Sequence, residues 1–299
     1  MAGIGRQTLQ NYEVLIIDDG STDGTIAICD EYAKKDNRIK VFHEPHKGVA
    51  HARQVGIEKA RGEYSIHIDA DDKIESTMLE EMYHAAKGAD ADILICDYLE
   101  KKKDGIIYRL QKPSALTKEI VVVDLLEGTL YGALWNKLIR TSVFRDNGVG
   151  FRQELRMRED MFFIFDVLPY MDRIAYLPKA FYTYDRTNNT ASLTNAYLCE
   201  DRNYYDQEIR WHEAALSSSM IVEEQKRRLR ESLLNYAYIT LSGYIFDKEE
   251  WMAVFAPLRV ELSKTSSSYK KLLVQQAMKG LYTPASIARR LLVLIKSTK

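Results

Sequence analysis

The stretch "NYEVLIIDDGSTDGT", residues 11–25, places an apolar run directly before two adjacent aspartates and a turn-rich segment. Residues 14–17 are apolar and rich in branched side chains, which predicts a short strand buried on both faces, as in parallel sheets. Ligands of open α/β sheets bind beyond the carboxyl ends of the strands, so Asp18 and Asp19 are candidate binding residues. The alternative is that Asp19 or Ser21 caps the helix predicted in "TIAICDEYAKKD".

Length and composition limit the class of protein. With 299 residues, of which 46% are hydrophobic and 28% charged, the chain can form one large domain and an appendage. A net charge of -1 gives no electrostatic reason to expect nucleic acid as a partner. The three cysteines, widely spaced and odd in number, favour a reducing compartment over a disulfide framework or zinc site. The sequence has no apolar run of about 20 residues and no signal-peptide core, so we expect a cytoplasmic protein.

Further strand and helix patterns follow along the chain. Residues 39–42 predict a second short strand, and "HKGVAHARQVGIEKARG" predicts a helix that ends at Gly62. In "EYSIHIDADD" apolar and polar residues alternate, which predicts a third strand over residues 64–69. Thr77 and Glu80 have the spacing of a capping box at the start of the next helix.

The alternation of these units predicts an α/β fold with a doubly wound, mostly parallel sheet. A further strand is expected in "ADILICDYLE", which ends at residue 100. Beyond residue 196 the pattern is mainly helical, and "VEEQKRRLRESLLNYAYITLSGYIF" is its longest periodic stretch. We therefore predict an α/β domain over residues 1–196 and a helical C-terminal region over residues 197–299.

The segment "DADD" is a second acidic turn at a strand end. Asp69 and Asp71 are two residues apart, so on an extended backbone their carboxylates point to the same side of the strand. Such oxygen ligands suit Mg²⁺ or Mn²⁺, which could hold a diphosphate and offset its charge as it departs. The alternative is a solvated turn with Asp72 near a helix start. His67 lies on the same side as Asp69, as a third ligand or as a histidine satisfied by its neighbours.

Basic residues lie between the two acidic turns, in "HKGVAHAR". A crevice lined only by carboxylates would repel a nucleotide phosphate, so a cation is needed nearby. We interpret Arg53 as functional and Lys47 as part of a solvated helix face.

The order "VLIIDDGSTDGT", "KGVAHARQVGI" and "GEYSIHIDADD" resembles glycosyltransferase family 2, enzymes of the GT-A fold that move a sugar from a nucleotide diphosphate donor. The similarity continues through "LWNKLIRTSVF" and "RMREDMFFIFDVL" to "LPKAFYTYDRTNNTASLT", over roughly residues 11–194. Single pieces such as D-x-D are common by chance, whereas this order and spacing are specific.

The resemblance implies roles on the donor side of the site. One or both of Asp18 and Asp19 would bind the base and ribose of the donor, with Arg53 bordering that pocket. Asp69 would contact the ribose side. Asp71 would ligate Mg²⁺ or Mn²⁺ between itself and the diphosphate.

The resemblance also implies the catalytic step. Asp160 would be the general base, with Glu159 as its neighbour, in a single displacement that inverts the anomeric carbon. Asp160 opens an apolar helix, whose N-terminus favours an ionised carboxylate; an N-cap is the alternative. Lys137 and Arg186 are further candidates for diphosphate contacts.

Relatives of this kind often build bacterial cell-surface polysaccharides, so we expect a UDP-sugar donor and a glycan or lipid-linked acceptor. Residues 284–299 form an amphipathic pattern with basic residues, which predicts a helix that contacts the inner face of the plasma membrane or packs on the protein itself.

The beginning of the sequence departs from the family pattern. Members begin with an apolar strand and a helix, a unit of about 30 residues before the next parallel strand, and ten residues precede Asn11 here. We therefore expect an N-terminally shortened chain. The alternatives are an inactive relative that acts as a nucleotide-sugar-binding or interaction module, and a nucleotidyltransferase, which would need a Gly-rich basic phosphate loop that the sequence lacks.

Overall fold

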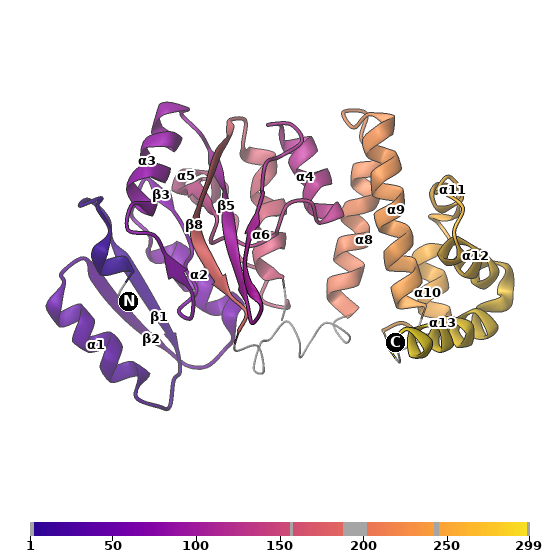
Figure 1. Ribbon diagram of the computed structural model, residues 1–299, viewed down its shortest axis with the longest axis horizontal. Helices are drawn as coiled ribbons and strands as arrows, with labels where there is room; N and C mark the ends of the chain where they lie inside the picture. The colour runs from indigo at the N-terminus through magenta and orange to yellow at the C-terminus, as the bar shows by residue number, and fades with distance from the viewer. Residues whose placement is uncertain (1–2, 156–157, 188–201, 242–244, 298–299) are drawn as a thin grey trace. The chain divides into compact units, whose positions relative to one another are not determined.

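The computed structural model describes residues 3–155, 158–187, 202–241 and 245–297 (Figure 1). The chain divides into two compact units: Met1–Val121 with Thr129–Ala191, and Val122–Gly128 with Ser192–Lys299. The predicted boundary between residues 196 and 197 lies outside the described residues and stays a prediction.

The first unit contains two sheets. The smaller pairs β1 (Val14–Asp19) in parallel with β2 (Ile39–Glu44). The larger has the strand order β3–β7–β5–β8–β4, with β6 on β5. Its strands are β3 (Tyr64–Ser65), β4 (Lys73–Ile74), β5 (Ile93–Lys102), β6 (Gly105–Arg109), β7 (Lys137–Arg140) and β8 (Ile174–Asp185).

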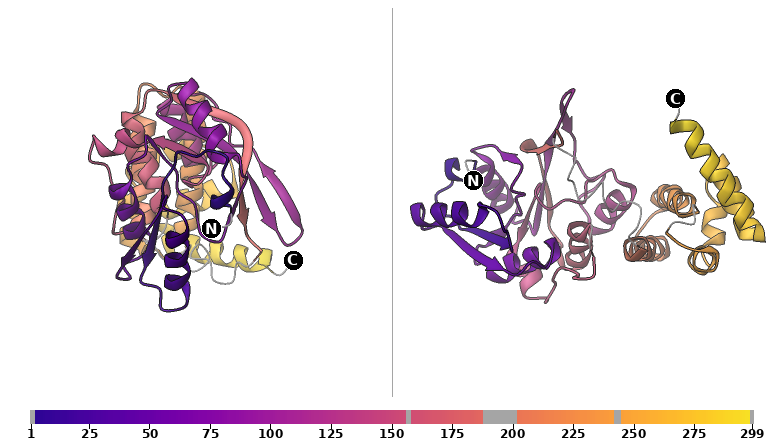
Figure 2. Two further views of the ribbon diagram at one scale, coloured as in Figure 1. Left: turned by 90° about the vertical axis from the view of Figure 1, so that its left-hand side faces the viewer. Right: turned by 90° about the horizontal axis from the view of Figure 1, so that it is seen from below.

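The α/β fold with a helical C-terminal region is confirmed, and its sheet is mixed rather than mostly parallel. Among the described strands β1–β2 and β5–β8 are parallel pairs, and the other four pairs are antiparallel. Residues 103–104 join β5 to β6, and so short a turn requires antiparallel pairing. Figure 2 shows this hairpin as a narrow two-stranded projection.

The predicted third strand is shorter than expected. Only Tyr64 and Ser65 form a ladder, with β7, and residues 66–69 join no sheet. Likewise, β1 pairs with β2 alone among the described strands. The alternation nevertheless identified the apolar face, because Ile66 and Ile68 pack against the core.

That core lies between α3 and the larger sheet, where Met78 and Met82 meet Cys96, Tyr98 and Leu138. Residues 161–165 of α6 are also buried throughout, as their continuous apolar sequence requires. The helices up to residue 170 are η1 (Ile4–Arg6), α1 (Thr25–Lys35), α2 (Val49–Lys59), α3 (Met78–Gly88), α4 (Lys118–Glu127), α5 (Thr141–Arg145), α6 (Glu159–Val167) and η2 (Leu168–Tyr170). Most of α4, from Val122 onward, belongs to the second unit.

The second unit is helical in its described residues. Trp251 and Phe255 of α10 are fully buried, and Asp247 with Glu250 forms a capping box that begins this helix. The helices are α8 (Arg202–Ser217), α9 (Glu223–Thr240), α10 (Lys248–Phe255), α11 (Arg259–Ser263), α12 (Tyr269–Gln276), η3 (Ala277–Leu281) and α13 (Tyr282–Ser297). Within the part of the chain that the structure describes, no helix is both long and apolar enough to cross a bilayer.

The start of α3 is stabilised differently from the sequence prediction. Thr77 makes no side-chain cap, and Glu80 accepts a hydrogen bond from Thr8 Oγ1 instead (2.6 Å), so the predicted capping box is wrong. Gln7 caps the helix from outside. Its Oε1 accepts the Leu79 N–H (3.0 Å), and its amide donates to the carbonyls of Gly3 and Glu75.

Replacement of Gln7 should therefore destabilise the first unit. In Gln7→Ala, the Leu79 N–H and the carbonyls of Gly3 and Glu75 lose the buried Gln7 side chain as partner, so we expect the free energy of unfolding to fall by about 1–3 kcal/mol. Chemical denaturation measures the change. Gln10→Ala, which removes an exposed amide from the same segment, is the control and should have little effect. Equal losses in the two variants would contradict this account of the cap.

Candidate active site

Asp18, at the end of β1, is buried and fully engaged by its neighbours. One carboxylate oxygen accepts the Ser21 N–H (3.2 Å), and the other lies 3.2 Å from His43 Nδ1. The bonds from Ser21 and then His43 hold the pKa of Asp18 below its usual value. Asp18 thus fixes the turn that follows β1.

Asp19 joins the first acidic turn to a later helix. Its carboxylate accepts the N–H groups of Lys47 (2.8 Å) and Gly48 (2.9 Å), immediately before α2. It therefore fixes the loop that leads into α2, and it does not cap α1, whose N-cap position is Gly24. Gly20 has φ of +75° and passes so close to His46 that a Cβ atom would lie 2.7 Å from its backbone nitrogen. The predicted contacts of Asp18 and Asp19 with base and ribose stay predictions.

Arg53 of α2 brings together residues that are far apart in the sequence. Its guanidinium lies 2.5 Å from Glu159 Oε1, 3.3 Å from Asp69 Oδ1 and 3.9 Å from Asp160 Oδ2. We call these four residues the Arg53 cluster. One guanidinium among three carboxylates leaves the cluster with net negative charge if all three are ionised.

Glu159 and Asp160 are the first two residues of α6 and differ in environment. The residue before them, Arg158, adopts a left-handed conformation with φ of +53°. The Glu159 side chain is 7% exposed, and burial together with Asp160 raises its pKa to about 7, against the opposing effect of Arg53. Asp160 is 20% exposed and accepts the Met161 N–H (2.7 Å). Of the two, Asp160 is the carboxylate that an acceptor could reach.

The second acidic turn is anchored to β8 by Asp72. The Tyr182 hydroxyl donates to Asp72 Oδ2 (2.6 Å), and the Asp185 N–H donates to Oδ1 (2.8 Å). Burial raises the pKa of Asp72 to about 6 and also raises the pKa of Asp69. Asp72 therefore holds the turn in place and does not begin a helix.

Asp71 suits a metal ion that is also bound by the substrate better than a metal site made of protein ligands alone. It is exposed and makes no hydrogen bond or ion pair with any described residue. Mg²⁺ typically takes one or two carboxylates and completes its shell with phosphate oxygens and water. In the described ranges no three acidic, histidine or cysteine side chains cluster as metal ligands, so further ligands would come from a diphosphate.

Burial lowers the pKa of His67 to about 3, and its neutral ring packs on Phe151.

Lys137 does not fit the predicted diphosphate contact. It is buried, and its ammonium group donates to the carbonyls of Tyr131 (2.7 Å) and Ala133 (2.6 Å) and to Asn136 Oδ1 (2.8 Å). Burial lowers the pKa of Lys137 to about 7. The lysine thus fixes the loop before β7 and offers no donor to a ligand.

Arg186, which follows β8, lies outside the Arg53 cluster. Its guanidinium donates to Glu100 Oε1 (3.0 Å) and lies 6.0 Å from the centre of the Tyr184 ring. Its contact with the donor diphosphate stays a prediction.

Sequence reasoning missed Tyr131 and Tyr182. Tyr131 is 39% exposed, and its neighbour Gly132 packs on α6 so closely that a Cβ atom would lie 2.7 Å from the Cβ of Met161. This places Tyr131 near Asp160. Neither tyrosine lies in a local motif, since each is positioned by partners distant in sequence. Gly132 in "YGALW" was the available signal, because a glycine allows a close approach to another element.

Known proteins are similar to the chain in sequence and in fold. Residues 2–148 match the glycosyl transferase family 2 model. The protein EpsH of Bacillus subtilis (strain 168) is 36% identical over 192 residues, which cover 62% of this chain and 55% of EpsH. The cholesterol galactosyltransferase of Borreliella burgdorferi is 33% identical over 190 residues, which cover 59% of this chain and 52% of that protein. The chain spans about half the length of these relatives.

Among solved structures, residues 1–349 of S. aureus TarS in complex with UDP-GlcNAc are similar to the chain, with a TM-score of 0.72. The match covers 97% of this chain and 86% of that one at 21% identity, a level that supports the fold alone. Together with the matched family model, it leads to one conclusion: residues 2–148 belong to a glycosyltransferase family 2 domain, and the chain has the GT-A fold.

Proposed function

We propose that the chain transfers a sugar from a nucleotide diphosphate donor, a UDP-sugar, to an acceptor hydroxyl with inversion, in the synthesis of bacterial cell-surface polysaccharide. The observation that carries this proposal is the Arg53 cluster, because it brings the second acidic turn and the start of α6 to one place. Donor-binding and base functions need that proximity.

Asp160 serves as the general base in this proposal. It is the more exposed carboxylate of its pair, and the N-terminus of α6 favours its ionised form. Asp160 accepts the proton of the acceptor hydroxyl as that oxygen bonds to the anomeric carbon, while the bond from that carbon to the diphosphate oxygen breaks. Glu159 and Arg53 position Asp160 in this proposal.

The donor side rests on Asp18, Asp19, Asp69 and Asp71. Asp18 and Asp19 border the nucleoside in this proposal, and the TarS structure with UDP-GlcNAc supports the choice of a UDP-sugar. Asp71, unpaired among the described residues, would hold Mg²⁺ or Mn²⁺, which would offset the charge of the diphosphate. The acceptor would be a glycan or a lipid-linked sugar at the inner face of the plasma membrane. Residues 284–299 would contribute peripheral contact there.

Substitutions of Asp71 and Asp160 should impair different steps, metal-dependent donor binding and sugar transfer respectively. Asp71→Asn removes the metal-binding carboxylate, so the thermal stabilisation by UDP that depends on Mn²⁺ should disappear. Asp160→Asn should keep that stabilisation and lose turnover by about 10²–10⁴-fold, as expected for a lost base. Thermal shift and UDP-sugar hydrolysis measure the two effects.

Asp146→Asn changes an exposed aspartate elsewhere on the unit and is the matched control. Near-normal turnover in Asp160→Asn would refute the base assignment. If the unchanged chain hydrolysed no UDP-sugar, the alternative of an inactive binding or interaction module would be favoured.

The Arg53 cluster should also make stability depend on pH. Burial, together with the charge of Asp160, raises the pKa of Glu159 to about 7, above its unfolded value. The folded state then binds more protons than the unfolded state, and stability falls as the pH rises from about 4.5 through about 7. Between pH 5 and pH 8, Glu159→Gln should reduce this loss by about 1–3 kcal/mol.

Denaturant titrations at the two pH values provide the measurement. Glu75→Gln, at an exposed glutamate outside the Arg53 cluster, should keep the wild-type dependence. The assignment is wrong if Glu159→Gln loses as much stability with rising pH as the wild type does.

A further inference from the structure

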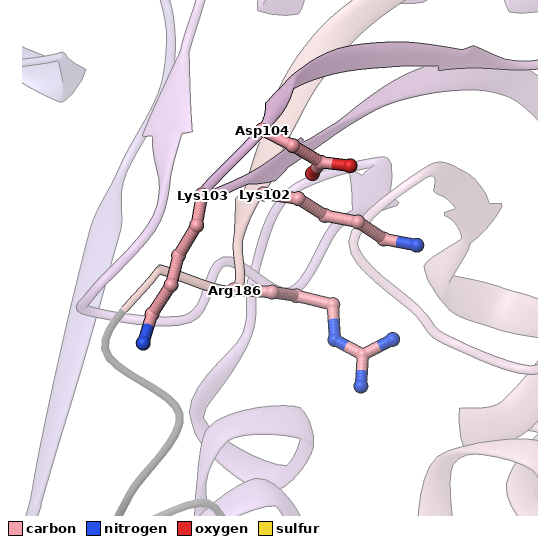
Figure 3. A pocket seen from close by; sticks show the side chains of 4 residues that line it. All are labelled: Lys102, Lys103, Asp104 and Arg186. Atoms are coloured by element: carbon pink, nitrogen blue, oxygen red, sulfur yellow. The ribbon is translucent and has the colours of Figure 1, made fainter. Parts of the chain in front are cut away.

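A basic depression lies away from the Arg53 cluster, between the tip of the β5–β6 hairpin and the end of β8. It is open, has a volume of about 330 Å³, and is lined by Lys102, Lys103, Asp104 and Arg186. Figure 3 shows Lys102, Asp104 and Arg186 extending to one side and Lys103 to the other. Its volume is at the lower end of the range for small-ligand sites, about 300–1,000 Å³.

Positive charge is in excess around this depression. Glu100 is buried beneath it and accepts hydrogen bonds from Arg109 and from Arg186 (3.0 Å), and Lys102 Nζ lies 3.6 Å from the same carboxylate. One carboxylate cannot neutralise three cations. The excess raises the local concentration of anions and would bind one directly.

The remaining charged neighbours do not remove this excess. Lys101 is neutralised by Asp185 at 2.7 Å, and Lys103 makes no ion pair with a described residue. Asp104 is the only carboxylate among the four lining residues. The side chains of Lys102 and Arg186 are 36% and 37% exposed, so both can reach a ligand. A doubly charged group such as a phosphate monoester or diphosphate fits this charge.

The depression is connected to the proposed base by aromatic side chains. Arg186 lies over Tyr184, and the rings of Tyr184 and Tyr131 are 6.3 Å apart. The next residue, Gly132, packs on Met161 beside Asp160. A ligand that presents a hydroxyl to Asp160 could therefore extend over Tyr131 toward Arg186.

We propose that this depression binds a phosphate group of the acceptor. The inference rests on the proposed function, since only a transferase has an acceptor, and it reassigns Arg186 from donor to acceptor. The shared chemistry is a phosphate ester, which could belong to a lipid-linked sugar or to the backbone of a soluble polyol phosphate polymer.

Calorimetric titration of the full chain tests the site, with farnesyl phosphate and glycerol 3-phosphate as separate probes. Saturable binding of at least one is expected, and the tighter probe identifies the lipid or polymer source. Lys102→Glu should weaken binding by about tenfold or more because it places a like charge beside the phosphate. Lys102→Arg should retain binding. Lys112→Glu, at an exposed lysine beyond the opposite end of β6, is the charge-matched control and should change little.

Two results would overturn the proposal: no saturable binding of either probe to the wild type, or equal weakening by Lys102→Glu and Lys112→Glu. UDP-sugar hydrolysis, measured on the same preparations, separates the two proposals. Probe binding without hydrolysis would refute the proposed function and leave the phosphate site standing. Loss of hydrolysis in Lys102→Glu would assign the depression to the donor diphosphate and refute the acceptor role.

Discussion

The contact of one guanidinium with three carboxylates organises the first unit. Arg53 lies on α2, Asp69 in the second acidic turn, and Glu159 and Asp160 at the start of α6. Truncation of the arginine would leave buried negative charge without a partner, which costs more than the ion pair itself contributes. The positions of α2, the second turn and α6 therefore depend on one another through this side chain.

Local patterns in the sequence predicted the elements well and their partners poorly. The apolar run before Asp18 identified β1, and the apolar sequence after Asp160 identified a helix that begins at Glu159. These apolar patterns depend only on residues that are neighbours in the sequence. They therefore predict the strand or helix whatever it packs against in the folded chain. The length of the third strand was wrong because a ladder needs a second strand, and no local pattern specifies that partner.

The site shows the same division. Residue types and their order indicated which carboxylates matter, yet not what holds them. Asp72 is fixed by Tyr182, 110 residues away, and Asp19 by the backbone before α2. Lys137 had the right charge for a diphosphate, but three oxygen atoms of its own loop engage it. Burial decides such cases, and burial is a property of the folded chain.

The separate β1–β2 sheet has a consequence for the dynamics of the first acidic turn. Its two strands form ladder hydrogen bonds only with each other, since neither pairs with another described strand. Elements that share few hydrogen bonds with the rest of a domain open at lower free energy than the whole domain unfolds. Amide protons of β1 and β2 should thus exchange with solvent before those of β5 and β8. Through Asp19, each opening event would also release the backbone of Lys47 and Gly48 before α2.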